Sequence, residues 1–215
     1  MIKEDLKINA LTDDEIKWAI DFYENSPNKI FNESSYTYWI DIDKEPLMLD
    51  WLTDCFPFLQ NKIVTAFIYT MTTGYLPHCD GTAQNQLQLN IPLKRTYSED
   101  QYFIVFNQKT KVGPITWCDG KYPLVDEKVS GLNNLFYGPI LPDQVEGHTM
   151  KYLDRDFYDK HLYRNPEIYW GLSPKIVFNQ KPGDVLSFNP NRVHCTGKMP
   201  KDEEKLGIVV RYEQS

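Results

Sequence analysis

The sequence predicts an α+β protein in which two N-terminal helices precede a closed or two-sheet β core. Helical patterns come first in the chain, and short runs rich in β-branched and aromatic residues then follow one another. The chain has 215 residues, of which 41% are hydrophobic and 25% are charged. That length and mixture suit one globular domain (1–215) with a sizeable core.

The first part of the chain (1–61) is expected to form a helical support for the core. A capping-box pattern of Thr12 and Glu15 predicts a helix over about 13–24 with one buried face. A glutamate followed by proline predicts a second helix over about 45–55, because proline suits the first turn of a helix.

The β core is expected in 62–107 and 175–215, with a lid-like excursion over 108–174 between them. The excursion is rich in glycine, proline and tyrosine and is too long for a plain loop. The predicted strands share apolar alternation or a high content of branched and aromatic side chains. They lie at 34–43, 62–71, 76–80, 86–92, 101–107, 175–179, 184–188 and 206–212.

The charge balance restricts the partners that we expect. A formal net charge of −7 disfavours DNA or RNA as a substrate, because a polyanion is repelled by an acidic surface. No apolar run reaches about 18 residues, and the N-terminus carries acidic residues where a signal peptide would be apolar. We therefore expect a cytoplasmic protein with no membrane span, whose four cysteines form no CxxC pair and stay reduced.

Three residues form a candidate metal site. His78 and Asp80 are two positions apart on a predicted strand, so their side chains share one face. His194, just past the predicted strand 184–188, is the natural third ligand. Two histidines and one carboxylate form the facial triad of non-haem Fe(II) oxygenases, which leaves coordination positions open.

A Cys₂His₂ zinc site is the rival interpretation, because Cys79 and Cys195 directly follow the two histidines. Adjacent residues on a strand point to opposite faces, which argues against this site unless the backbone is irregular. A second rival is that the histidines are unrelated.

Two segments that contain the candidate ligands resemble a known family. Residues 69–80 read YTMTTGYLPHCD, and residues 181–197 read KPGDVLSFNPNRVHCTG. They resemble the two metal-ligand segments of prolyl-hydroxylase-like members of the Fe(II)/2-oxoglutarate dioxygenase superfamily, over roughly 63–92 and 181–212. The resemblance implies a double-stranded β-helix (jelly roll) core with the N-terminal helices packed on one sheet. It also implies Fe(II) as metal and 2-oxoglutarate as co-substrate.

The resemblance further implies residues that bind the co-substrate. Either Lys205 or Arg211 would hold its far carboxylate; the two share a face of one strand, and both could serve. The planar fork of arginine suits a carboxylate better, which slightly favours Arg211. Tyr69 matches a tyrosine that hydrogen-bonds the co-substrate, although it could equally be a core aromatic. Gln86, Gln88 and Asn90 form the amide face of the predicted strand 86–92, and these groups, Asn90 first among them, would line the pocket if that face points inward.

The function that follows is hydroxylation of a small molecule or a protein side chain with O₂. An intact Asp80 favours hydroxylation, since the halogenases of the superfamily lack this carboxylate. Two alternatives stay open: a cupin-like metal enzyme that does not use 2-oxoglutarate, and a non-catalytic β domain for binding or assembly. The substrate and the oligomeric state stay open too.

Overall fold

The computed structural model describes three α-helices and two 3₁₀ turns. The helices are α1 (Asp13–Asn25), α2 (Pro46–Cys55) and α3 (Arg155–His161), and the turns are η1 (Ile42–Lys44) and η2 (Pro57–Leu59). The residues that the structure describes are 5–7, 9–32, 37–72, 74–80, 85–110, 115–116, 136–137, 145–146, 155–162, 169, 172 and 174–214.

The described strands form two sheets that are mostly antiparallel. In spatial order, the first contains β1 (Asp5–Lys7), β12 (Val185–Phe188), β6 (Gln86–Arg95), β14 (Lys205–Glu213), β4 (Ile63–Met71), β3 (Thr37–Asp41) and β2 (Ile30–Asn32). The second contains β10 (Val145–Glu146), β7 (Tyr102–Thr110), β13 (Arg192–Thr196), β5 (His78–Cys79), β8 (Ile115–Thr116) and β9 (Phe136–Tyr137), and β11 (Pro174–Asn179) also pairs with β7.

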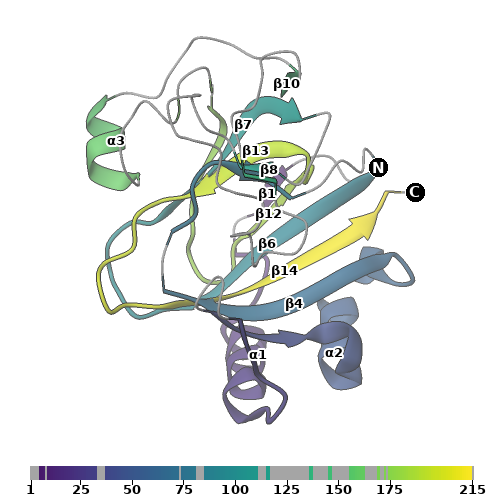
Figure 1. Ribbon diagram of the computed structural model, residues 1–215. Coiled ribbons are helices and arrows are strands. Elements are labelled where there is room, and N and C mark those ends of the chain that lie inside the picture. The colour runs from purple at the N-terminus through teal and green to yellow at the C-terminus, as the bar shows by residue number, and fades with distance from the viewer. Residues whose placement is uncertain are drawn as a thin grey trace.

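The two N-terminal helices pack on one face of the first sheet. Figure 1 shows α1 and α2 below β6, β14 and β4, on the side away from β7 and β13. The predicted capping box starts α1, with Thr12 and Glu15 each bonded to the backbone of the other. Buried apolar side chains of both helices join those of β6 and β14 in one core, as Leu52, Leu89 and Ile208 illustrate.

The opposite face of the same strands is polar and points toward the second sheet. Leu89 and Ile208 lie in the helix-side core, so strand alternation directs Gln88, Asn90 and Arg211 to the other face. Across β6 and β14, Gln88 is the register partner of Arg211. The amide face of β6 therefore points inward, which was the condition for it to line a pocket.

Several predicted elements are confirmed, with shifted ends. Each of the eight predicted strands overlaps an observed one, but 42–43 belong to η1, and β6 and β7 run three residues further than predicted. The sequence did not predict β13, which carries His194. The expected excursion lies mostly outside the described residues, as does any lid within it. In the described part of the chain, no helix is long and apolar enough to cross a membrane.

Candidate metal centre

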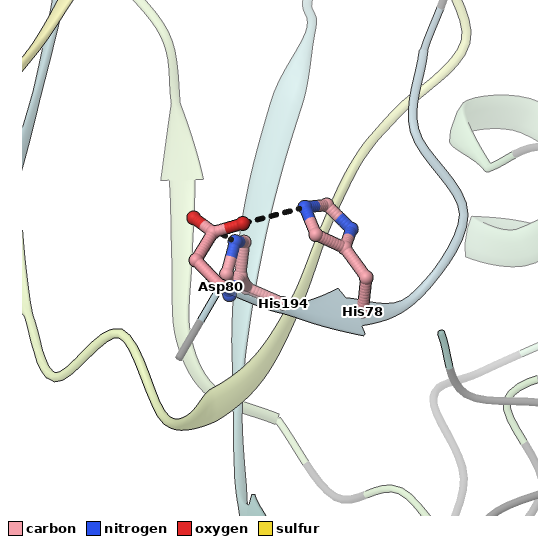
Figure 2. Close-up of side chains that lie close together, drawn as sticks. All are labelled: His78, Asp80 and His194. Carbon is pink, nitrogen blue, oxygen red and sulfur yellow. Dashed lines mark ion pairs between the residues drawn. The ribbon is translucent and has the colours of Figure 1, made fainter. Parts of the chain in front are cut away.

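The fold brings the three candidate ligands together from two strands of the second sheet. His78 lies on β5 and His194 on β13, and the two are direct partners in the antiparallel register. Asp80 comes just after β5, where its backbone N–H donates to the carbonyl of Pro190 at 2.9 Å. Figure 2 shows the three side chains converging, and one ligand atom from each lies within 4.8 Å of the others.

The distances suit a single ion bound by all three side chains. Asp80 Oδ1 lies 3.6 Å from His78 Nε2, and Asp80 Oδ2 lies 3.3 Å from His194 Nε2. The two imidazole centroids are 4.3 Å apart. Two nitrogens and a carboxylate at this spacing form the donor set of a two-histidine, one-carboxylate metal site.

The backbone fixes both histidines in the tautomer that a metal ligand needs. His78 Nδ1 lies 2.6 Å from the carbonyl oxygen of Leu76, and His194 Nδ1 lies 2.8 Å from that of Arg192. A carbonyl only accepts hydrogen bonds, so each Nδ1 carries the hydrogen and each Nε2 keeps its lone pair. Those lone pairs are on the nitrogens that face the Asp80 carboxylate.

The pKa values of His78 and Asp80 are both shifted from their usual ranges. Burial and then the neighbouring His194 lower the pKa of His78 to about 4, so its ring is neutral at neutral pH. For Asp80, burial alone would raise the pKa. The opposing effects of His194, His78 and Arg211 outweigh burial and hold the pKa of Asp80 well below its usual range. These are the protonation states that bind a metal ion.

Aromatic rings wall the site on the side of His194. Its ring lies 5.4 Å from Phe103 and 4.9 Å from Phe188, centroid to centroid. These phenylalanines belong to a buried apolar cluster between the sheets. An apolar wall limits the movement of the imidazole and keeps water from that side of the site.

The glycines of the two motif segments are required by close packing. A side chain on Gly74 would collide with the carbonyl of Gly197, and one on Gly197 would meet the carbonyl of His161 at 2.5 Å. The two segments that carry the ligands therefore contact each other through their glycines. This contact gives a steric reason for Gly74, and the approach of the His161 carbonyl gives one for Gly197.

The cysteines do not join the histidines. Cys79 and Cys195 are buried in an apolar cluster with Ile104 and Phe106. Burial raises the pKa of Cys195 well above its usual range, which keeps it a protonated thiol. The strand alternation that argued against a Cys₂His₂ zinc site thus holds in the fold.

The structure separates the predicted co-substrate residues. Arg211 lies at the triad, with Nη2 3.6 Å from Asp80 Oδ2. Lys205 is buried at the other end of β14, where its Nζ donates to Gln180 Oε1 at 2.7 Å. Tyr69 is buried on β4, close enough for the charge of Asp80 to affect its pKa. Asn90 is buried on β6.

The amide that reaches the triad is not the one that the sequence favoured. Gln88 donates from Nε2 to Asp80 Oδ2 at 2.9 Å, so it is Gln88 whose amide reaches the triad. The sequence places Gln88 and Asn90 on the same amide face, and the prediction favoured Asn90. The missing signal is the register of β6 against β14, which sets Gln88 opposite Arg211.

Solved structures with a similar fold are known. The chain resembles SnoN, a non-haem α-ketoglutarate-dependent epimerase from nogalamycin biosynthesis, at 12% identity and a TM-score of 0.53, covering 97% of this chain and 77% of that one. It resembles the carbocyclase SnoK from the same biosynthesis at 12% identity and a TM-score of 0.51, covering 95% and 76%. Iron-bound HygX from Streptomyces hygroscopicus matches at 11% identity and a TM-score of 0.52, covering 98% and 82%.

The likeness establishes the fold. At 11–12% identity it does not extend to activity or substrate. No protein-family model matches the sequence, and no curated protein matches it. The prolyl-hydroxylase-like subgroup therefore still rests on the two sequence motifs.

Proposed function

We propose that the chain is an oxygenase domain that depends on Fe(II) and 2-oxoglutarate, with a double-stranded β-helix core. The observation that carries the proposal is the pair of histidines whose Nε2 lone pairs face one carboxylate. The fold is shared with SnoN, whose structure holds Fe³⁺ and α-ketoglutarate. In non-haem oxygenases this donor set binds Fe(II) and leaves coordination positions open for a co-substrate and O₂.

The residues present fit the metal. His78, Asp80 and His194 would hold Fe(II), and the neutral ring of His78 and the ionised carboxylate of Asp80 need no change of protonation on binding. When bound, iron and 2-oxoglutarate supply the oxidising chemistry, with succinate and CO₂ as co-products. The protein contributes the positions of the reacting groups and a water-poor wall of aromatic rings.

Lys205 is the stronger candidate for the far carboxylate of the co-substrate, which reverses the slight preference for Arg211 from sequence. Arg211 already faces Asp80. Lys205 is buried, and burial lowers its pKa to about 7. In the described residues its hydrogen bond goes to a neutral amide, that of Gln180. An entering carboxylate would supply the counter-charge that a buried ammonium lacks.

Tyr69 supports the same pocket. Burial, with smaller effects of Tyr75 and Asp80, raises the pKa of Tyr69 well above its usual range. The phenol therefore stays protonated and can donate a hydrogen bond to a carboxylate oxygen. Asn90, buried on the same inward face as Gln88, would add a second polar group. We assign both residues to the co-substrate.

The proposed reaction is hydroxylation of a small molecule or a protein side chain. An intact Asp80 supports it, because the carboxylate occupies the position that a halide would need. Substrate choice is open between the two classes. The net charge of −7 makes a nucleic acid the weakest candidate.

The test is an anaerobic titration. Purified protein receives Fe(II) and then 2-oxoglutarate, while the visible charge-transfer absorption of the iron–oxoacid complex is followed. We expect a band in the wild type that is absent from His194→Ala. Iron binding without the band would contradict 2-oxoglutarate use and favour a cupin-like enzyme. The absence of metal binding would favour a non-catalytic β domain.

A further inference from the structure

The two oxygens of the Asp80 carboxylate have different surroundings. Oδ2 accepts a hydrogen bond from Gln88 Nε2 at 2.9 Å and lies 3.6 Å from Arg211 Nη2. Oδ1 faces His78 Nε2 at 3.6 Å, as the dashed line in Figure 2 shows. Oδ2 also lies 3.3 Å from His194 Nε2, so this oxygen faces the second histidine as well as the two polar groups of the first sheet. The contacts from the first sheet therefore affect how the carboxylate is turned toward both histidines.

The orientation of the Gln88 amide follows from its two partners. Its Oε1 accepts from Arg211 Nε at 3.0 Å, while its Nε2 donates to Asp80. A guanidinium only donates hydrogen bonds, and an ionised carboxylate only accepts them. If the amide were flipped, its NH₂ group would face the guanidinium and its oxygen would face the carboxylate, and neither contact would be a hydrogen bond. The hydrogen bonds therefore run in one direction, from Arg211 through Gln88 to Asp80.

This chain of hydrogen bonds connects the two sheets. Gln88 and Arg211 are register partners on β6 and β14 of the first sheet. Asp80 follows β5 of the second sheet and lies beyond its last paired residue. The carboxylate is thus held by the sheet opposite the one that carries the two histidines. Its position relative to His78 and His194 depends on the contact with Gln88.

We infer that Gln88 and Arg211 are positioning residues, which hold the Asp80 carboxylate in the orientation, between the two histidines, that binds the metal. The inference rests on the proposed function, since it concerns the same triad. It gives Arg211 a role in metal binding that is separate from anchoring the co-substrate. Hydrogen bonds to a ligating carboxylate typically change metal affinity by about 10- to 100-fold.

The experiment measures metal affinity without co-substrate or turnover. Co(II) is titrated into apo protein by calorimetry, and its visible spectrum is recorded. Gln88→Met keeps the length of the side chain and removes both hydrogen bonds. Gln86→Met is the matched control, with the same change on the same strand and face, in the last register pair of β6 with β14. Gln88→Asn, which keeps the amide but shortens it, is the second test variant.

We expect Gln88→Met and Gln88→Asn to bind Co(II) about tenfold or more weakly than the control, with an altered spectrum. Their melting temperatures without metal should stay close to that of the control. Equal affinity and an unchanged spectrum in either folded variant would overturn the inference and leave the proposed function standing. Failure of the wild type to bind Co(II), or binding unaffected by His194→Ala, would overturn the proposed function itself.

Discussion

The two faces of β14 differ in what they contribute to the protein. One face, which includes Ile208, packs with β6 and the N-terminal helices in the main core. The other carries two cations, Lys205 and Arg211, toward the second sheet. Burial of the first face stabilises the fold. The second face holds charged groups that cost stability unless a partner offsets them.

The two cations on the polar face differ in turn. Arg211 is partly exposed and faces the carboxylate of Asp80. Lys205 is buried and bonded to the amide of Gln180. A cation beside a protein carboxylate orients that carboxylate, whereas a buried cation bonded to a neutral group has the capacity to bind an anion. Four experiments test these distinctions.

The largest expected effect is the loss of stability caused by a substitution on the apolar face of β14. Ile208→Ala should lower the free energy of unfolding by about 2–5 kcal/mol, because it removes a fully buried side chain from the main core. Denaturant titration measures the change. Metal affinity of the folded protein should stay at its wild-type value. A loss of metal affinity would show that the two faces are not independent.

Lys205→Met tests the co-substrate assignment. We expect 2-oxoglutarate to bind about 10- to 150-fold more weakly, because a charge-assisted hydrogen bond is worth about 1.5–3 kcal/mol. Titration of the iron-loaded protein measures the change. Lys201→Met, in an exposed turn, is the control. Wild-type affinity in Lys205→Met would return the anchoring role to Arg211.

The same lysine should produce a pH dependence of stability in the metal-free protein. Its pKa falls from 10.5 to about 7 on folding, so between those values the unfolded chain holds a proton that the folded chain lacks. Stability therefore rises with pH through this window, by up to about 1.4 kcal/mol per pH unit from this group. Unfolding at pH 7 and pH 9 should show a smaller rise in Lys205→Met than in the wild type.

The smallest expected effect is that of substituting Arg211, at the end of β14 beside the candidate metal site. Arg211→Lys keeps the charge but loses the planar fork that contacts both Gln88 and Asp80. We expect Co(II) affinity to fall about tenfold. Binding of 2-oxoglutarate at saturating metal should change less than in Lys205→Met. A larger effect on 2-oxoglutarate than on Co(II) would contradict the separate roles of the two cations.

Much of the fold and of the metal site could be predicted from local pattern. The capping box of α1 and the alternation of β6 involve residues near one another in the chain, so their signals survive in the sequence. The strand β13 could not be predicted, because its residues have no strong strand pattern. It is a strand through pairing with β5 and β7, which lie far away in the chain.

The sequence by itself pointed to the three residues of the candidate triad, since strand alternation places His78 and Asp80 on one face and the second motif segment offers His194. Only the tertiary structure decided the roles of the polar residues around it. Gln88 contacts Asp80 because the register of β6 sets it opposite Arg211, and register depends on two distant strands. Lys205 is buried and bonded to Gln180, 25 residues away in the chain. Period-two alternation is a local property, whereas register and burial belong to the assembled sheets.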